Sequence, residues 1–277
     1  MMKLQAAKGP IVELDQTSVL DIRTLIIDGI DLSPHRAIPD DGDPRIDHSL
    51  EGFLFTCGPD HIRHPEPIGD GSGRRYPLHG SFSSHPATIF HQSDSECRAE
   101  IPVRHADGGQ SLLERHWRID GETGVVALRD RITNSGHAPF PAMLMYHMNV
   151  AAKLFDDAVR LEGAMLDEGG FGWRFGAEPG GVFCVAANGD TAGADGWTEF
   201  RLGPIASVGG LTLVVRFDTA SLPFLQIWRN QQAPANVVGI EPVSHRWVGR
   251  EDLAKGGELE MLAPGESREF GLDFFFM

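Results

Sequence analysis

The sequence has few basic residues and no long apolar run. Its 277 residues include 24 lysines and arginines against 39 aspartates and glutamates, which gives a formal charge of −15. Such a charge repels nucleic acids and anionic lipid surfaces, so we expect neither of them as a partner. No stretch approaches the roughly 18 apolar residues that a membrane span needs, and residues 1–16 contain no apolar run of signal-peptide length.

Cysteine is also scarce. Cys57, Cys97 and Cys184 are odd in number and widely spaced. A disulfide framework normally uses an even number of cysteines, and free thiols are typical of reducing compartments. The sequence therefore predicts a cytoplasmic protein, and it leaves both a monomer and a homodimer open.

Windows long enough for an ordinary helix are rare, because 33 glycines and 18 prolines interrupt the chain. What remains is a series of short segments with alternating or β-rich composition, at 51–58, 86–92, 112–120, 124–134, 142–151, 211–218, 224–230, 236–242 and 268–276. The pattern predicts an all-β protein with many strands. No repeat or charge block divides residues 1–277, so we expect one domain.

Two of these segments are predicted to form a β-hairpin. The alternation in 112–120 places Arg115, Trp117 and Ile119 on one face and His116 and Arg118 on the other. By contrast, the glycine-rich segment 193–210 is expected to be a surface loop, and 156–172 also fits a regular strand poorly.

The chain contains neither a GxGxxG motif nor a P-loop, so the candidates for chemistry are ionisable residues in apolar or Gly/Pro-marked surroundings. They are His79 in PLHG, His147 in MLMYHMNV and Glu241 in VVGIEPVSH. An imidazole and a carboxylate in a partly desolvated cleft can act as general acid and general base near neutral pH. Taken singly, a hydrogen-bonded core histidine or a glutamate at a strand end explains each residue equally well.

Four motifs occur in an order that resembles the galactose-mutarotase-like superfamily: LHG at 78–80, YHMN at 146–149, GIEP at 239–242 and LAPGESREFGLDFFF at 262–276. FLFTCGPDHIRHP, followed by LHG and HPA, more closely resembles a bacterial family of uncharacterised aldose-1-epimerase-like proteins, the domain of unknown function 4432. The resemblance covers about residues 50 to 277. It implies a single large antiparallel β-sandwich with a sugar cleft on one curved sheet.

The resemblance also implies an isomerase activity of the aldose 1-epimerase (mutarotase) type, with a small carbohydrate as substrate. The histidine matching His147 would protonate the ring oxygen, Glu241 would take the proton of the anomeric hydroxyl, and His79 would assist at the ring oxygen. The sugar then opens, rotates about its first carbon–carbon bond and closes on the other face. This reaction needs only proton transfer and positioning, so we expect no cofactor and no metal. Candidate substrate-binding residues are Asp60, His61, Arg75, Asn149, Trp228 and Arg229.

One position departs from the resemblance. The closer family commonly has an arginine directly after LHG, where this chain has Ser81. Arg63, Arg75 or Arg229 could supply the missing guanidinium. His85, just before a proline, is expected to be a neighbouring loop residue without a catalytic role.

Other functions remain open at this point. Cys57, His61 and His64 are spaced as C-x3-H-x2-H, which would suit a metal-dependent sugar isomerase or lyase, although three ligands on one short loop rarely complete a metal site. A glycoside hydrolase would need a second carboxylate, for which Glu114 and Asp60 are candidates. A non-catalytic carbohydrate-binding β-sandwich would need exposed aromatic residues, whereas aromatic residues of all kinds make up only 8% of the chain.

Overall fold

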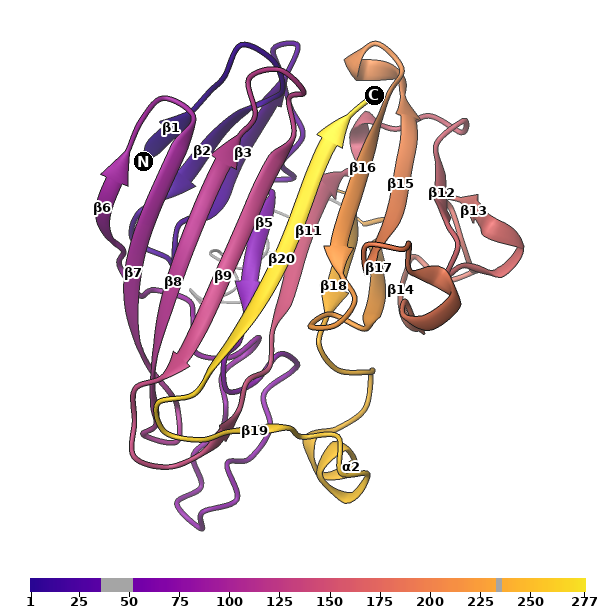
Figure 1. Ribbon diagram of the computed structural model, residues 1–277. Coiled ribbons are helices and arrows are strands. Elements are labelled where there is room, and N and C mark those ends of the chain that lie inside the picture. Colours follow the sequence, from indigo (N-terminus) through magenta and orange to yellow (C-terminus); the bar gives the residue numbers. More distant parts are fainter. Residues whose placement is uncertain (36–51, 233–235) are drawn as a thin grey trace.

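Two antiparallel β-sheets stack face to face in the computed structural model, which describes residues 1–35, 52–232 and 236–277 (Figure 1). The first sheet contains, in spatial order, β1 (Met2–Leu4), β2 (Ile11–Asp15), β3 (Asp21–Ile27), β5 (Leu54–Cys57), β11 (Met145–Ala151), β18 (Val237–Val243), β17 (Phe224–Asn230) and β14 (Gly180–Ala186), with β4 (Ile30–Asp31) beside β3. The second contains β13 (Gly170–Gly172), β12 (Arg160–Gly163), β15 (Trp197–Ile205), β16 (Leu211–Asp218), β20 (Ser267–Phe276), β9 (Val126–Asn134), β8 (Gln110–Ile119), β7 (Glu96–Arg104) and β6 (Thr88–Gln92). The all-β prediction is therefore confirmed.

Shorter elements join and cap the sheets. β10 (Phe140–Pro141) pairs with β19 (Met261–Leu262) at the lower end of Figure 1, where α2 (Arg250–Lys255) also lies. Single turns of 3-10 helix are η1 (Ala152–Leu154), η2 (Asp167–Gly169), η3 (Gly189–Thr191) and η4 (Ala206–Val208). Within the described part of the chain, none of the helices has the length and apolar character that crossing a membrane requires.

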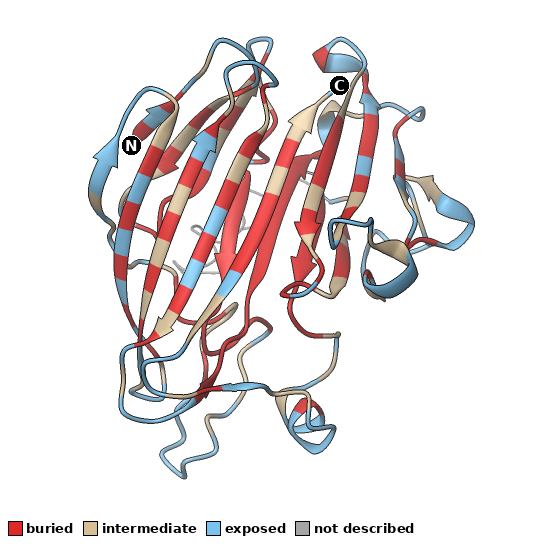
Figure 2. Cartoon of the chain, in the orientation of Figure 1, coloured by how far each residue is buried: buried red, intermediate tan, exposed pale blue. Residues whose placement is uncertain are grey.

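The second sheet has one buried and one solvent-facing side. Its strands alternate between buried and more exposed residues along their length, as Figure 2 shows for β7, β8 and β9. β8 and β9 form the predicted hairpin, and Arg115, Trp117 and Ile119 lie on its buried face as expected. A period-two pattern of this kind arises because successive side chains in a strand point to opposite faces.

The middle of the first sheet is different, because β5, β11 and β18 are buried on both faces (Figure 2). Tyr146 and Ile240 point inward into the main core between the sheets. Met145 and Val243 point outward, where they pack with Ile62 of the β5–β6 connection and with α2 in a second, smaller apolar cluster. The outer face of the first sheet is therefore covered by loops and can hold residues away from water.

The prediction of a surface loop at 193–210 is wrong, because nine of these residues form β15 between β12 and β16. Thr198, Phe200, Leu202 and Ile205 are among its buried residues. The strand alternates regularly from Trp197 to Leu202 and then shifts register before Ile205, and the glycines around it outweighed this signal in the sequence. The irregular segment 156–172 likewise includes β12 and the short β13. The extent of the domain, residues 1–277, stays a prediction.

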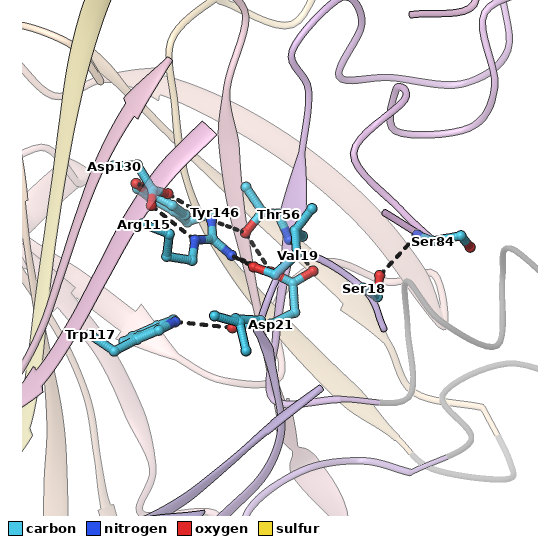
Figure 3. A network of polar contacts seen from close by, with 10 residues as sticks. Ser18, Val19, Asp21, Thr56, Ser84, Arg115, Trp117, Asp130 and Tyr146 are labelled. Atoms are coloured by element: carbon cyan, nitrogen blue, oxygen red, sulfur yellow. Dashed lines mark hydrogen bonds and ion pairs between the residues drawn. The ribbon is translucent and has the colours of Figure 1, made fainter. Parts of the chain in front are cut away.

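A buried ionic network joins the two sheets (Figure 3). The guanidinium of Arg115 on β8 forms two hydrogen bonds to Asp130 on β9, at 2.9 and 2.6 Å, and one of 2.9 Å to Asp21 on β3. Its remaining N–H groups donate to the carbonyl of Val19 and the hydroxyl of Thr56 on β5. All five guanidinium N–H groups are thus satisfied away from water.

Replacing Arg115 by methionine is expected to destabilise the protein by about 3 to 5 kcal/mol, because Asp21 and Asp130 would stay buried without a cation. The free energy of unfolding from a urea titration measures the change. Arg118→Met is the matched control, since Arg118 lies on the same strand with 60% of its side chain exposed and should change stability by less than about 0.5 kcal/mol. Equal effects of the two substitutions would contradict the role given to the network.

Candidate active site

Three of the sequence-predicted residues meet on the outer face of the first sheet, and they come from separate segments. His147 lies on β11, Glu241 on β18, and His79 in the connection between β5 and β6. The antiparallel register of β11 and β18 pairs Met148 with Ile240, so that His147 lies opposite Glu241. His147 Nε2 is 3.1 Å from Glu241 Oε1, and the His79 and His147 rings stack with centroids 5.3 Å apart.

Gly239 makes this arrangement sterically feasible. A Cβ atom at this position would lie 2.6 Å from Glu241 Oε1 and 3.2 Å from His147 Cε1. The first distance is shorter than real Cβ atoms show and the second is tighter than most, so a larger residue would require the Glu241 carboxyl group to shift. The glycine of the GIEP motif therefore leaves room for the carboxylate two residues later.

His79 is held in an uncommon backbone conformation. Its φ angle is +62°, in the left-handed region that non-glycine residues seldom adopt. Its N–H donates to the carbonyl of Arg63 at 2.8 Å, and its carbonyl accepts from the N–H of Gly58 at 2.9 Å. Gly80 follows with φ +85°, where a Cβ would overlap the carbonyl oxygen of His61. The LHG sequence thus forms a tight turn that directs the imidazole onto the sheet.

A hydrogen-bonded relay fixes the Glu241 carboxyl group. Gln226 on β17 lies directly opposite Glu241, and its Nε2 donates to Glu241 Oε2. Arg63 Nη1 donates to the Gln226 amide oxygen at 3.2 Å, which sets the orientation of that amide. The Arg63 guanidinium is buried, donates to the carbonyls of His245 and Arg246, and lies 4.6 Å from the ring centroid of Trp247.

Burial displaces the pKa values of the central pair in opposite directions. It raises the pKa of Glu241 to about 8 and lowers the pKa of His147 to about 4, because each charged form loses its hydration. Burial likewise lowers the pKa of His79 well below its usual range. Between about pH 4 and pH 8 the His147–Glu241 pair therefore carries a single acidic proton.

Several polar atoms around the pair are buried and have no hydrogen-bond partner among the described residues. They are His147 Nδ1, Glu241 Oε1, Asn149 Oδ1 and Arg63 Nε. His147 Nε2 is close to Glu241 Oε1, but the two are not aligned for a hydrogen bond. Buried polar groups are normally paired, so a cluster of unpaired ones identifies a place where a polar ligand would complete the bonding.

Two more of the predicted residues lie beside the pair. Asn149 is on the same face of β11 as His147, and its Nδ2 donates to the carbonyl of Gly52 at 3.2 Å. Trp228 on β17 lies opposite Gly239, and its ring meets the His147 ring edge to face at 5.6 Å. Both side chains could therefore contact a ligand bound at His147.

Asp60 and Ser81 form a structural unit of the loop. The Asp60 carboxylate accepts hydrogen bonds from the N–H and hydroxyl of Ser81, at 3.0 and 2.7 Å, and from the N–H of Ala106 at 3.0 Å. Asp60 thus anchors the residue that stands where the closer family commonly has arginine.

The structure does not bring the other three predicted binding residues into the cluster. The ring of His61 stacks on Tyr76, and exposed Arg75 donates to the carbonyl of Pro65. Arg229 follows Trp228 on β17 and therefore points to the opposite face, where it packs on Phe175.

The residues of the alternative metal site are turned to other partners. His61 Nε2 contacts the carbonyl oxygen of His64 at 2.7 Å, and Cys57 Sγ lies 3.2 Å from His79 Nδ1. Within residues 1–35, 52–232 and 236–277, no group of three or more His, Cys, Asp or Glu side chains is arranged to hold a metal ion. Glu114, one of the two carboxylates considered for the hydrolase alternative, lies on β8 of the other sheet and not beside Glu241.

His85 lies in the loop before β6, and its Nε2 accepts a hydrogen bond from the N–H of Arg104 at 3.1 Å.

Sequence reasoning missed Gln226 and Trp247. Gln226 carried a usable signal, because it is a lone polar residue in the apolar part of β17. Trp247 carried none, since only the folded chain brings it over Arg63.

Several solved structures have a fold similar to that of this chain. A candidate aldose 1-epimerase from Klebsiella pneumoniae is 18% identical, with a TM-score of 0.76 over 97% of this chain and 77% of that one. A galactose mutarotase-like protein from Lactobacillus casei is 14% identical, with a TM-score of 0.72 over the whole of both chains. A galactose 1-epimerase from Lactobacillus acidophilus is also 14% identical, with a TM-score of 0.62 over 99% and 93%.

These likenesses establish a galactose mutarotase-like fold, as the sequence motifs predicted. No curated protein matches the chain. The family described as domain of unknown function (DUF4432) matches residues 33–166 and 183–275, which is most of the sequence. The chain belongs to the DUF4432 family.

Proposed function

We propose that this protein is a carbohydrate isomerase of the aldose 1-epimerase type, which interconverts the anomers of a small sugar. The observation that carries the proposal is the meeting of His147, Glu241 and His79 on one face of the first sheet, with His147 and Glu241 3.1 Å apart. An imidazole and a carboxyl group at this distance form an acid and base pair of the kind that ring opening needs.

The number of protons in the pair suits the reaction. Ring opening removes a proton from the anomeric hydroxyl and adds one to the ring oxygen, and ring closure reverses both transfers. The pair holds one acidic proton near neutral pH, so one member can donate while the other accepts. By resemblance, His147 is the acid towards the ring oxygen and Glu241 the base towards the anomeric hydroxyl. Without sugar, burial favours the proton on Glu241, a state that differs only by a transfer within the pair.

The surroundings support a polar ligand with an apolar face. The unpaired atoms of Asn149 and Arg63 would bond to sugar hydroxyls, and the indole of Trp228 would pack on the carbon skeleton. Asp60, His61, Arg75 and Arg229 receive no such support as contacts. The three free cysteines suit a reducing compartment, and we infer a cytoplasmic location from them.

Removing either member of the pair should abolish most of the activity. We expect His147→Ala and Glu241→Ala each to lower kcat/KM for anomer exchange at least about 100-fold, since a positioned acid or base contributes about 10²- to 10⁴-fold. Saturation-exchange NMR of anomeric protons measures the rate, and circular dichroism checks the fold. Glu241→Gln, which keeps the side-chain volume, should behave like Glu241→Ala.

His91→Ala and Glu114→Ala are matched controls, because both residues are at least partly exposed on the second sheet. They should leave the exchange rate unchanged. Near wild-type activity of the two site variants would show that the pair does not perform the proton transfers.

The activity should follow a bell-shaped pH profile. Below about pH 4 His147 becomes protonated while Glu241 keeps its proton, so the base is lost. Above about pH 8 Glu241 loses the shared proton, so the acid is lost. Plotting log(kcat/KM) against pH should therefore give a plateau bounded by limbs near these values.

Gln226→Leu provides a test of the alkaline limb. The hydrogen bond from Gln226 stabilises the carboxylate form of Glu241, so its loss should move that limb to higher pH. A profile governed by one ionisation near the usual histidine pKa, about 6.5, would contradict the assignment of the limbs to the buried pair.

A further inference from the structure

Cys57 has a polar contact whose role the reaction scheme does not explain. It is the last residue of β5, lies opposite Met145 of β11, and its side chain is fully buried on the outer face of the sheet. Its Sγ atom is 3.2 Å from Nδ1 of His79. The imidazole is therefore bound on one edge by a thiol and stacked on one face against His147.

The protonation states of Cys57 and His79 determine which of the two donates the hydrogen bond. Burial raises the pKa of the Cys57 thiol well above its usual range, and a neighbouring carboxyl group, Glu241, acts in the same sense. Burial also lowers the pKa of His79, so both groups are neutral near pH 7. A neutral thiol has one S–H donor and a neutral imidazole has one lone-pair nitrogen. The favourable arrangement is Sγ–H donating to Nδ1, which leaves the ring proton on Nε2.

The other ring nitrogen is available for a ligand. Among the described residues, His79 Nε2 has no hydrogen-bond partner, because the side chain makes its contacts through Nδ1 and through the faces of its ring. His79 is half-buried, whereas His147 and Glu241 are buried. Its backbone is held by Gly58 and Arg63, and its ring by the contact with Cys57 and the stacking on His147.

We propose that Cys57 is a positioning residue that holds His79 as the Nε2–H tautomer, so that His79 presents a hydrogen-bond donor to an oxygen atom of the ligand. The choice of a sugar oxygen as acceptor rests on the function proposed above, whereas the control of the tautomer does not. The bond at one ring nitrogen of a histidine fixes what the other nitrogen can do.

The tautomer matters for the chemistry at the ring oxygen. An ether-type ring oxygen has only lone pairs to offer, and charge of negative sign develops on it as the ring opens. A donor at Nε2 stabilises that charge, whereas an unprotonated Nε2 would repel it. Cys57 thus contributes to a step that it does not touch.

Ring-nitrogen NMR tests the proposal directly. In protein labelled with ¹⁵N at the histidine rings, two-bond ¹H–¹⁵N correlations distinguish the tautomers, and His79→Gln assigns the signals. Wild type should show Nδ1 of His79 unprotonated and Nε2 protonated near pH 7. In Cys57→Ala the Nδ1 signal should move towards the value of a mixed tautomer population, and Cys57→Ser, which retains a donor, should restore the pattern at least in part.

Cys97→Ala is the matched control, because Cys97 is equally buried and its side chain has no polar contact among the described residues. It removes the same atom from the core and should leave the His79 signals unchanged. An unaltered His79 pattern in Cys57→Ala, or a wild-type spectrum with the proton on Nδ1, would overturn the proposal.

Kinetics give a second readout. Cys57→Ala should lower kcat for anomer exchange about tenfold or more with little change in KM, in line with the loss of a partner that orients a functional histidine. Cys57→Ser should recover part of kcat, and Cys97→Ala should keep wild-type kcat. If the proposed function is wrong, the wild-type protein will catalyse no anomer exchange. The ring-nitrogen NMR signals of His79 would still decide whether Cys57 controls its tautomer.

Discussion

The fold of this protein depends on one buried cation. Arg115 lies between the two sheets with all its N–H groups bonded, and Tyr146 donates to the same carboxylate, Asp130, that the guanidinium binds. A buried charge without its partners is very costly, so the network tolerates few other registers of the strands that contribute to it. Thr56 on β5 and Tyr146 on β11 are among those contributors.

The same constraint positions the candidate active site. Cys57 follows Thr56, and His147 follows Tyr146, so each pair of neighbours points to opposite faces of the sheet. Fixing Thr56 and Tyr146 on the inner face consequently fixes Cys57 and His147 on the outer one. The ionic network and the candidate site thus lie on opposite faces of the same strands. The rigidity of the network therefore helps to fix the geometry of the site.

The sequence alone predicted the features that local pattern determines. Alternation identified the β8–β9 hairpin, and apolar surroundings singled out His147 and Glu241. It did not predict the relay through Gln226, because register between strands far apart in the chain brings that residue opposite Glu241. Alternation could have separated Trp228 from Arg229, since adjacent residues of one strand cannot line the same face. The glycine-flanked strand β15 was missed because its turn signals outweighed its alternation.

The candidate active site contains features that lower local stability and that suit a reactive site. Unpaired polar atoms, a left-handed histidine and two ionisable groups with displaced pKa values all lie within one small region, where an ordinary core would have apolar side chains. Departures of this kind from well-satisfied packing concentrate at functional sites. Their coincidence on residues from β11, β18 and the β5–β6 connection is what distinguishes the candidate site from a satisfied core.

The most direct test of this account is saturation-exchange NMR of anomeric protons on a panel of neutral and modified aldoses, with the unmodified protein before and after chelator treatment. The account predicts exchange faster than the buffer rate for at least one sugar, and no effect of the chelator. No exchange for any sugar, or new carbonyl or alkene signals that disappear with the chelator, would contradict it and favour metal-dependent isomerisation or elimination.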